Sequence, residues 1–315
     1  MSLAAVLFAA GRGQRLRPLT DEVAKPALPV LDVPLAAFGL RRLFDVAPAV
    51  VLNLRHLPES VTTAVAPYLP LDGRLDALYE TPEAYGTAGT LAAVADRVTS
   101  RVVTWNSDLL TDLDALSLVR AHEASGAPAT IAVAEVASGA DFVLEGGRAV
   151  AFVDRRERSD VAGGVFIGAA VFERAALDAL PETRPAGLGE TLLAWLADAG
   201  NLAVHRHDRY WRDVATPASY LDASLDLLEG HGPEPPGGSW PGDVVEVEDG
   251  VAYLGPGAAA TEDALGPGAI LLARSTAGAG SRIERSIVWP DEHLPRGTQL
   301  RDAIWFGGRR IVGRH

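Results

Sequence analysis

Two patterns of apolar positions alternate along the chain from residue 1 to about residue 228. Short apolar runs predict strands at Leu3–Phe8, Ala49–Leu54, Leu75–Tyr79, Val102–Trp105 and Ala129–Val136. Apolar positions with helical spacing predict helices at Pro34–Phe44, Glu59–Leu69, Thr90–Val98 and Asp114–Ser125. The alternation predicts an α/β fold with a Rossmann-like mixed, mostly parallel sheet and helices on both faces. Ligands of such sheets bind beyond the carboxyl ends of the strands.

The alternation becomes less regular after Asp141. Glycines 146 and 147 predict the turn of a hairpin over Phe142–Val153. Further strands are expected at Val165–Phe172 and Leu202–His207, and helices at Gly189–Asp198 and Pro217–Leu228.

A third pattern follows a segment rich in proline and glycine. Apolar or small residues recur every six positions at Tyr253, Ala259, Leu265, Leu271, Ala277 and Ile283; the register slips near Trp289 and resumes at Leu294, Leu300 and Phe306. A six-residue period with neighbouring glycines predicts a left-handed β-helix-like hexapeptide domain, the alternative being an irregular glycine-rich β-tail. We therefore expect a catalytic domain over 1–230, a linker over 231–242 and a C-terminal domain over 243–315.

Composition narrows the functional classes. The 315 residues carry a net charge of −13, which argues against a nucleic-acid-binding surface. The chain has no cysteine, so disulfides, thiolate catalysis and cysteine-bound zinc are excluded. Met1–Phe8 predicts a buried strand and not a signal peptide, and no apolar run approaches the ~18 residues of a membrane span. We expect a cytoplasmic protein that does not bind membranes.

A glycine-rich turn follows the first predicted strand. Gly11 and Gly13 permit backbone conformations with positive φ and close approach of main-chain N–H groups to an anion, as in phosphate-binding turns. The alternative is a plain tight turn. Leu16 stands where the dinucleotide fingerprint requires a third glycine, and the Walker A sequence is absent.

Lys25 is the only lysine among the 28 basic residues. An ammonium is a compact point charge on a flexible stem, whereas a guanidinium is a flat fork, so the two are not interchangeable at a tight polyphosphate site. The position of this ammonium, shortly after the glycine turn, favours a role in binding phosphate.

The complete string from Gly11 to Val30 resembles the signature of the sugar-1-phosphate nucleotidylyltransferases, or NDP-sugar pyrophosphorylases. It contains Gly-x-Gly-x-Arg-Leu-x-Pro-Leu-Thr, followed by Lys-Pro-x-Leu-Pro-Val. The resemblance covers essentially the whole chain and implies transfer of a nucleotidyl group from an NTP to a sugar 1-phosphate, with Arg15 and Lys25 as catalytic residues. The nucleotide-binding residues that it implies are Ala9, Ala10, Gly11, Gly13, Glu80, Gly86 and Thr87.

Two aspartates complete the expected reaction centre. Asp108 follows the strand Val102–Trp105, at the edge of the sheet where ligands bind. Asp213 lies in Trp211-Arg212-Asp213-Val214-Ala215-Thr216-Pro217, which resembles a family segment with glycine in place of Ala215. The resemblance implies that both aspartates bind Mg²⁺, a hard cation that prefers oxygen ligands.

The sugar side departs from the family pattern. The family's Glu-Lys-Pro segment corresponds to Asp154-Arg155-Arg156-Glu157, so Arg155 or Arg156 replaces the lysine or the contact is missing. Gly164 lies in a strand that resembles the family's Asn-x-Gly strand, with the asparagine changed. We predict Asp141, Arg155 and Gly164 as sugar-binding residues.

The motifs do not decide which base the NTP carries or which sugar 1-phosphate accepts the nucleotidyl group. The motifs slightly favour mannose 1-phosphate with GTP, while the short region around Asp141 resembles N-acetylmuramate-1-phosphate uridylyltransferases. Glucose-1-phosphate nucleotidylyltransferases, a choline-phosphate cytidylyltransferase and a non-catalytic NDP-sugar-binding regulatory subunit are the alternatives. The C-terminal domain is expected to serve homo-oligomer contacts or regulation.

Overall fold

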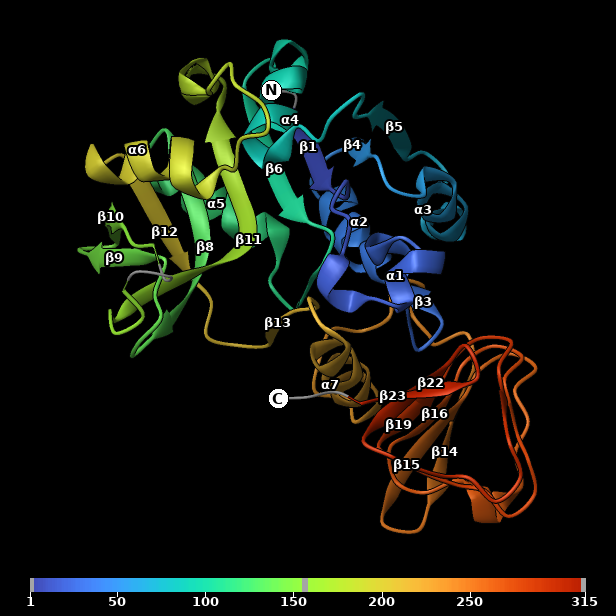
Figure 1. The fold of residues 1–315 in the computed structure, drawn as a ribbon. Helices are drawn as coiled ribbons and strands as arrows, with labels where there is room; N and C mark the ends of the chain where they lie inside the picture. Colours follow the sequence, from blue (N-terminus) through green and yellow to red (C-terminus); the bar gives the residue numbers. More distant parts are fainter. Residues whose placement is uncertain (1–2, 155–157, 313–315) are drawn as a thin grey trace.

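The computed structural model describes residues 3–154 and 158–312, and its largest element is a nine-stranded mixed sheet in the upper part of Figure 1. The strands follow the order β5-β4-β1-β6-β11-β8-β12-β10-β9. In that order their bounds are Arg74–Tyr79, Ala49–Leu54, Leu3–Phe8, Arg101–Asn106, Gly163–Glu173, Ala129–Val136, Leu202–Arg206, Arg148–Phe152 and Phe142–Glu145. A mixed α/β sheet is therefore confirmed.

Strand direction divides this sheet into two halves. β5, β4, β1 and β6 run parallel to one another. β11 is antiparallel to β6 and β8, and β10 is antiparallel to β9 and β12. β12 is parallel to β8, but the other pairs of this half are antiparallel, so the expectation of a mostly parallel sheet is wrong for the second half. There β9 and β10 are joined by a tight hairpin turn, whereas parallel neighbours need a long crossover.

Helices cover both faces of the sheet (Figure 1). The first face carries α2 (Leu35–Phe44), α3 (Pro58–Val65) and α5 (Ala115–Ser125), and the second carries α4 (Gly86–Val94) and α6 (Ala194–Asp198). Side chains of β1 alternate between the two cores: Ala5 and Leu7 contact the first, while Val6 and Phe8 contact the second. This alternation explains why β1 is apolar throughout its length.

The C-terminal region is a coil of short strands stacked in parallel ladders, with an antiparallel hairpin at its beginning (243–254) and at its end (303–312). In one ladder Tyr253 pairs with Ile270, Ile270 with Ile287, and Ile287 with Ile304. Each turn of this ladder takes 17 residues and not three times six, which explains the slip in the six-residue register near Trp289. The strands are β14 (Asp243–Val247), β15 (Gly250–Leu254), β16 (Ala269–Leu271), β17 (Thr276–Ala277), β18 (Arg282–Glu284), β19 (Ser286–Val288), β20 (His293–Leu294), β21 (Gln299–Arg301), β22 (Ala303–Phe306) and β23 (Arg309–Val312).

Short elements connect the sheet to the coil. α7 (Pro217–Leu228) lies between them in Figure 1 and packs against the coil and against the short strands Pro29–Val30 and Trp211–Asp213. The remaining elements are α1 (Leu19–Glu22), β2 (Pro29–Val30), β3 (Val33–Pro34), β7 (Leu109–Thr111), β13 (Trp211–Asp213), the 3-10 helices Gln14–Leu16, Lys25–Ala27, Ala66–Tyr68, Ala95–Arg97, Arg174–Ala179 and Glu262–Ala264, and the π-helix Gly189–Leu193. A shared core of residues from α2, α7 and the coil fills the space between the two parts.

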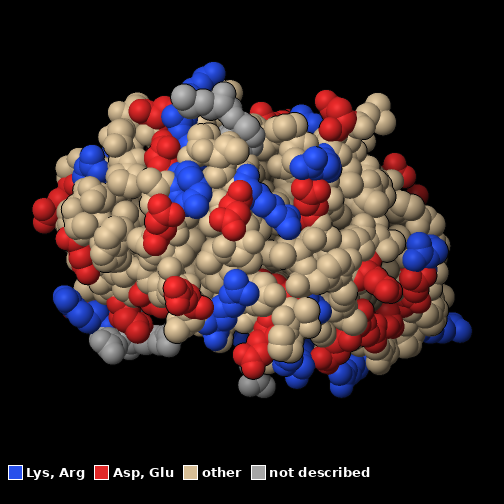
Figure 2. Space-filling view, turned by 90° about the horizontal axis from the view of Figure 1, so that it is seen from above, with Lys and Arg blue, Asp and Glu red and all other residues tan. Residues whose placement is uncertain are grey.

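The surface carries charged side chains of both signs. Figure 2 shows acidic and basic side chains interspersed on the face seen from above, with acidic side chains gathered toward one end. Within residues 3–154 and 158–312, no helix combines the length and the apolar character that crossing a bilayer requires.

Candidate active site

The glycine turn begins where β1 ends and closes on Lys25. The N–H of Ala9 donates a hydrogen bond of 2.6 Å to Asn53 Oδ1, which fixes the start of the turn. Gly13 has φ 60°, and a Cβ there would lie 2.9 Å from Thr20 Cγ2 and 3.1 Å from Lys25 Cβ. The fold therefore requires glycine at position 13. Gly11 differs, because a Cβ there would meet nothing within 4 Å.

Lys25 lies between the two predicted metal-binding aspartates. Its Nζ is 2.5 Å from Asp108 Oδ2 and 3.7 Å from Asp213 Oδ1. Only 12% of the Lys25 side chain is exposed, whereas 55% of the Asp213 side chain is exposed. The ammonium is thus held inside the site while one carboxylate remains open to solvent and ligands.

Strand pairing explains why these distant residues meet. β6 lies parallel to β1, and the N–H of Ser107 donates to the carbonyl of Phe8 at 3.0 Å, so Asp108 emerges beside the glycine turn. β7 then pairs antiparallel with β13, with Leu109 opposite Asp213. The two carboxylates are therefore brought together by the backbone and not by a local motif.

The two carboxylates affect each other electrostatically. Although much of the Asp213 side chain is exposed, the loss of water on its protein-facing side is the main cause that raises its pKa, and the nearby Asp108 carboxylate raises it further. The positive charges of Lys25 and Arg15 act in the opposite direction. A further cation beside Asp213 would favour its ionised form.

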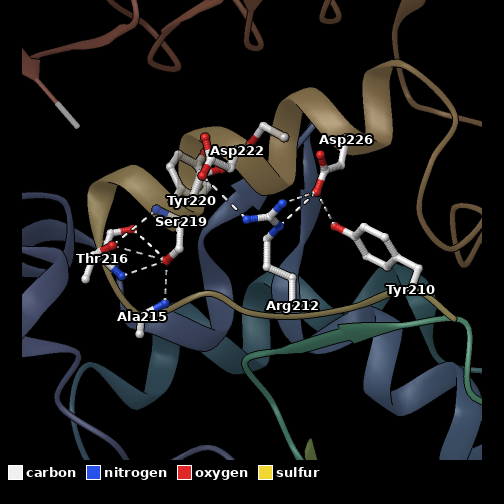
Figure 3. Close-up of polar contacts among 9 residues, drawn as sticks. Tyr210, Arg212, Ala215, Thr216, Ser219, Tyr220, Asp222 and Asp226 are labelled. Carbon is white, nitrogen blue, oxygen red and sulfur yellow. Dashed lines mark hydrogen bonds and ion pairs between the residues drawn. The ribbon is translucent and has the colours of Figure 1, made fainter. Parts of the chain in front are cut away.

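Helix α7 fixes the strand that carries Asp213 (Figure 3). Arg212 donates from Nε to Asp226 Oδ2 at 2.8 Å and from Nη1 to Asp222 Oδ2 at 3.4 Å. At the start of α7, Thr216 and Ser219 form a reciprocal capping box, which satisfies the first N–H groups of the helix. The short β13 is consequently anchored to α7 by Arg212 and by the cap that follows the strand.

Alanine at position 215 is compatible with this cap. The N–H of Ala215 donates to Ser219 Oγ at 2.9 Å, as does the N–H of Thr216. The departure from the family's glycine therefore leaves the geometry around Asp213 in place.

Two hollows meet at Asp108. One, of about 630 Å³, is lined by the glycine turn together with Arg15, Lys25 and Asp108. The other, of about 590 Å³, is lined by Asp108, Asp213 and the strand segment 165–167. Two separate ligands could therefore meet at this carboxylate.

Glu80 holds a network that sequence reasoning did not anticipate. It is buried, and its Oε1 accepts hydrogen bonds from Asn53 Nδ2 at 2.7 Å and from Thr90 Oγ1 at 2.6 Å. Its Oε2 accepts the N–H of Tyr85 at 2.8 Å. Because Asn53 also holds Ala9, this network ties the glycine turn to the start of α4. The sign of this network in the sequence is the amide residue Asn53, which lies near the end of β4, the strand beside β1.

The predicted nucleotide-binding residues Gly86 and Thr87 pack tightly at the start of α4. Gly86 has φ 72°, and a Cβ there would lie 2.3 Å from the carbonyl oxygen of Ala186. The hydroxyl of Thr87 accepts the N–H of Leu188 at 2.8 Å. Arg184 stacks over the ring of Tyr85 at 4.0 Å from its centre. Gly86 and Thr87 therefore anchor the chain segment 186–188 to α4.

On the sugar side, Asp141 supports the wall of the second hollow. Its Oδ2 accepts the N–H of Phe166 at 2.9 Å, and its own N–H donates to the carbonyl of Gly164 at 2.9 Å. Gly164 is buried, and a Cβ there would lie 3.1 Å from both Leu144 and Val133. The predicted Arg155, like its alternative Arg156, lies outside the described residues.

A family model agrees with this geometry. Residues 4–230 match the model named Nucleotidyl transferase. The chain belongs to this family. It is therefore a nucleotidyltransferase, and the matched region contains the glycine turn, Lys25, Asp108 and Asp213.

Several named proteins resemble this nucleotidyltransferase. A mannose-1-phosphate guanylyltransferase from Mycobacterium tuberculosis is 28% identical, with 98% of this chain and 80% of the relative covered. A UTP–glucose-1-phosphate uridylyltransferase from Synechocystis is 25% identical, with 96% and 87% covered. A solved chain from Bacillus anthracis, described as a glucose-1-phosphate thymidylyltransferase, shares the fold with a TM-score of 0.61 and 18% identity over 71% of this chain and 94% of that one.

Proposed function

We propose that the chain transfers a nucleotidyl group from an NTP to a sugar 1-phosphate, giving an NDP-sugar and pyrophosphate. The observation that carries the proposal is the position of Lys25, between Asp108 and Asp213 at the junction of two hollows. The relatives named above, which act on mannose 1-phosphate and glucose 1-phosphate, support the same reaction.

The reaction needs charge stabilisation and positioning more than covalent help from the protein. An oxygen of the sugar phosphate bonds to the α-phosphorus, and the bond from that phosphorus to the leaving pyrophosphate breaks. Lys25 would offset negative charge at the reacting phosphates, and the fork of Arg15 would hold the β- and γ-phosphates in the first hollow. The open space at Gly11 would let phosphate oxygens approach the main chain.

Asp108 and Asp213 are suited to hold Mg²⁺. Both are carboxylates, which supply the oxygen ligands that Mg²⁺ prefers, and both line the second hollow. Among the residues that the structure describes, no three His, Asp or Glu side chains form a metal site by themselves. Substrate phosphates and water would therefore complete the coordination, as is usual for Mg²⁺, and the ion would neutralise phosphate charge.

The substrate pair is proposed with a slight preference for GTP and mannose 1-phosphate. The M. tuberculosis mannose-1-phosphate guanylyltransferase, which aligns with 98% of this chain, supports that preference. We also propose that the C-terminal coil is a left-handed hexapeptide β-helix that serves oligomer contacts, that Asp141, Gly164 and one arginine of 155–156 contact the sugar phosphate, and that the enzyme acts in the cytoplasm, where NTPs are supplied.

A substrate matrix tests the reaction. Pyrophosphate release is measured for GTP, UTP, ATP, CTP and dTTP, each combined with mannose, glucose and N-acetylmuramate 1-phosphates and with phosphocholine, in the presence of Mg²⁺. We expect turnover with at least one sugar 1-phosphate and the highest rate with GTP and mannose 1-phosphate. NDP-sugar binding without any turnover would support the regulatory-subunit alternative and would overturn the catalytic one.

A further inference from the structure

The tip of the β2–β3 hairpin lies seven residues beyond Lys25 and has an unfavourable backbone. Leu31 has φ 48° and Asp32 has φ 61°, so two consecutive residues other than glycine are left-handed. Such two-residue turns normally use Asn-Gly or a similar pair. Leucine in particular is disfavoured in this region, so contacts outside the hairpin must hold the tip.

Those contacts come from the C-terminal coil. Asp32 Oδ1 accepts the N–H of Ala273 at 2.9 Å, and its Oδ2 accepts the hydroxyl of Tyr253 at 3.0 Å. The Tyr253 hydroxyl also lies 3.1 Å from the carbonyl of Leu31. A Cβ at Gly255 would lie 2.2 Å from Asp32 Oδ2, so the coil leaves room for the carboxylate only because this residue is glycine. We call Asp32, Tyr253, Gly255 and Ala273 the hairpin clamp.

The clamp is continuous with the reaction centre. Leu28 and Val30, which follow Lys25, pack in one buried core with Tyr253 and with coil residues of the same ladder. On the other side of this core, the Tyr220 hydroxyl of α7 donates to the carbonyl of Pro29. Since α7 begins directly after the Asp213 segment, the ammonium and this carboxylate are supported by the same packed surface.

We propose that Asp32 is a positioning residue and that the C-terminal coil, acting through the hairpin clamp, holds Lys25 at its place between Asp108 and Asp213. The inference rests on the proposed function for its kinetic consequence and deepens it. The coil then belongs to the machinery of the reaction centre, although none of its residues up to 312 lines either hollow.

Because Lys25 is the only lysine, it can be observed alone. Labelling the full-length protein with ¹⁵N-lysine gives one backbone amide signal and one side-chain ammonium signal, both from Lys25. The signals are recorded without substrate, so they report the position of Lys25 independently of any turnover. Stability of every variant is checked by thermal unfolding.

Three substitutions separate the clamp from the turn itself. Asp32→Gly removes the carboxylate while glycine favours the left-handed turn, and Tyr253→Phe removes only the hydroxyl. Asp32→Asn keeps an acceptor for Ala273 and offers a donor to Tyr253, so it should restore most of the function. The control is Asp302→Gly, since Asp302 is also a left-handed aspartate of the coil (φ 47°) but lies in an exposed ion pair with Arg285.

We expect Asp32→Gly and Tyr253→Phe to shift or broaden both Lys25 signals and to lower kcat about 10-fold, with KM for both substrates within about two-fold of the unaltered protein. The Lys25 signals and the kcat of Asp32→Asn and Asp302→Gly should stay close to those of the unaltered protein. Unchanged signals and unchanged kcat in Asp32→Gly and Tyr253→Phe would overturn the proposal, as would a loss of stability with no effect on either. If the unaltered protein turns over no substrate pair while the signals still respond, the clamp stands and the proposed function fails.

Discussion

The side of the candidate active site that we propose binds phosphate and the side that we propose binds the sugar are built in different ways. The phosphate side comes mainly from one continuous segment, from Gly11 to Lys25, that closes on itself through Gly13. The proposed sugar side is assembled from three separate segments, namely the end of β6 with the start of β7, β11 and β13, and Asp141 supports β11 by accepting the N–H of Phe166. Among the residues that the structure describes, Asp108 alone lines both hollows.

The difference teaches where specificity and rate are determined. The phosphate side presents fixed positive charge, which acts on the transfer step that every NTP undergoes. The proposed sugar side presents apolar side chains of β11 together with Asp108 and Asp213, and its wall depends on hydrogen bonds between separate segments. Changes on the first side should therefore lower kcat, whereas changes on the second should mainly raise KM for the sugar phosphate.

The largest effect is expected for the residue that both sides share. Asp108→Asn removes the charge that pairs with Lys25 at 2.5 Å and that would bind the metal, so we expect kcat to fall by ~10³ or more. Pyrophosphate release is measured over a wide range of Mg²⁺ concentrations. The control Asp114→Asn should be neutral, because Asp114 caps α5 and asparagine caps equally well. Recovery of Asp108→Asn at high Mg²⁺ would show that the carboxylate only raises metal affinity.

The next effect tests whether the phosphate side needs an ammonium or merely a positive charge. Lys25→Arg should be nearly as damaging as Lys25→Ala, with kcat lower by ~10²–10³ in both. The reason is space: Lys25 Cβ lies close to Gly13, and its Nζ already contacts Asp108, so a longer, planar guanidinium does not fit the same position. Rates within a few-fold of the unaltered enzyme for Lys25→Arg would mean that charge alone matters.

Local pattern was sufficient for much of the fold. The predicted strands Ala49–Leu54 and Ala129–Val136 have the bounds found in the structure. The helix that the segment 85–89 is expected to open does begin there, at Gly86, and ends at Val94; the fit of Gly86 against Ala186 is a contact that no local pattern shows. The direction of β11 likewise depends on its partners β6 and β8, so the sequence pattern could not give it.

The same distinction between local sequence pattern and contacts with remote residues applies to the candidate site. Gly13, Lys25, Asp108 and Asp213 lie in segments with a readable motif, and the structure brings the last three together. Residues whose meaning depends on remote partners were missed. Asn53 bonds to Thr90, 37 positions away, and Asp32 bonds to Ala273, 241 positions away.

A smaller effect should separate the sugar side from the phosphate side. Asp141→Ala leaves the N–H of Phe166 without this acceptor and should loosen the wall of the second hollow. We expect KM for the sugar 1-phosphate to rise about 10-fold, with kcat and KM for the NTP changing little, in steady-state assays that vary each substrate separately. Asp141→Asn, which keeps an oxygen acceptor, serves as the control. A larger rise in KM for the NTP would contradict the division between the two sides.

The smallest effect is expected for His122, which supports strands β8 and β11 of the large sheet. His122 of α5 is buried and contacts Thr130 of β8 at 2.9 Å and Glu173 of β11 at 3.3 Å. Burial lowers the pKa of His122, and Glu173 opposes this shift only in part. The folded state therefore binds fewer protons than the unfolded state, whose histidine has a pKa near ~6.5. The stability that neutral His122 provides is complete above that value and is lost as the pH falls through it toward the lower folded-state pKa.

Urea unfolding at pH 8 and pH 5 measures this loss against the variant His122→Gln, which does not titrate. We expect the free energy of unfolding to fall more steeply in the unaltered protein, by on the order of 1 kcal/mol, the usual size of a single-residue effect. The KM for the NTP should not follow this change, because His122 supports β8 and β11 and not the glycine turn. An equal pH dependence in both proteins would mean that His122 carries its proton in the folded state as readily as in the unfolded state. The contacts with Thr130 and Glu173 would then offset the cost of burying that charge.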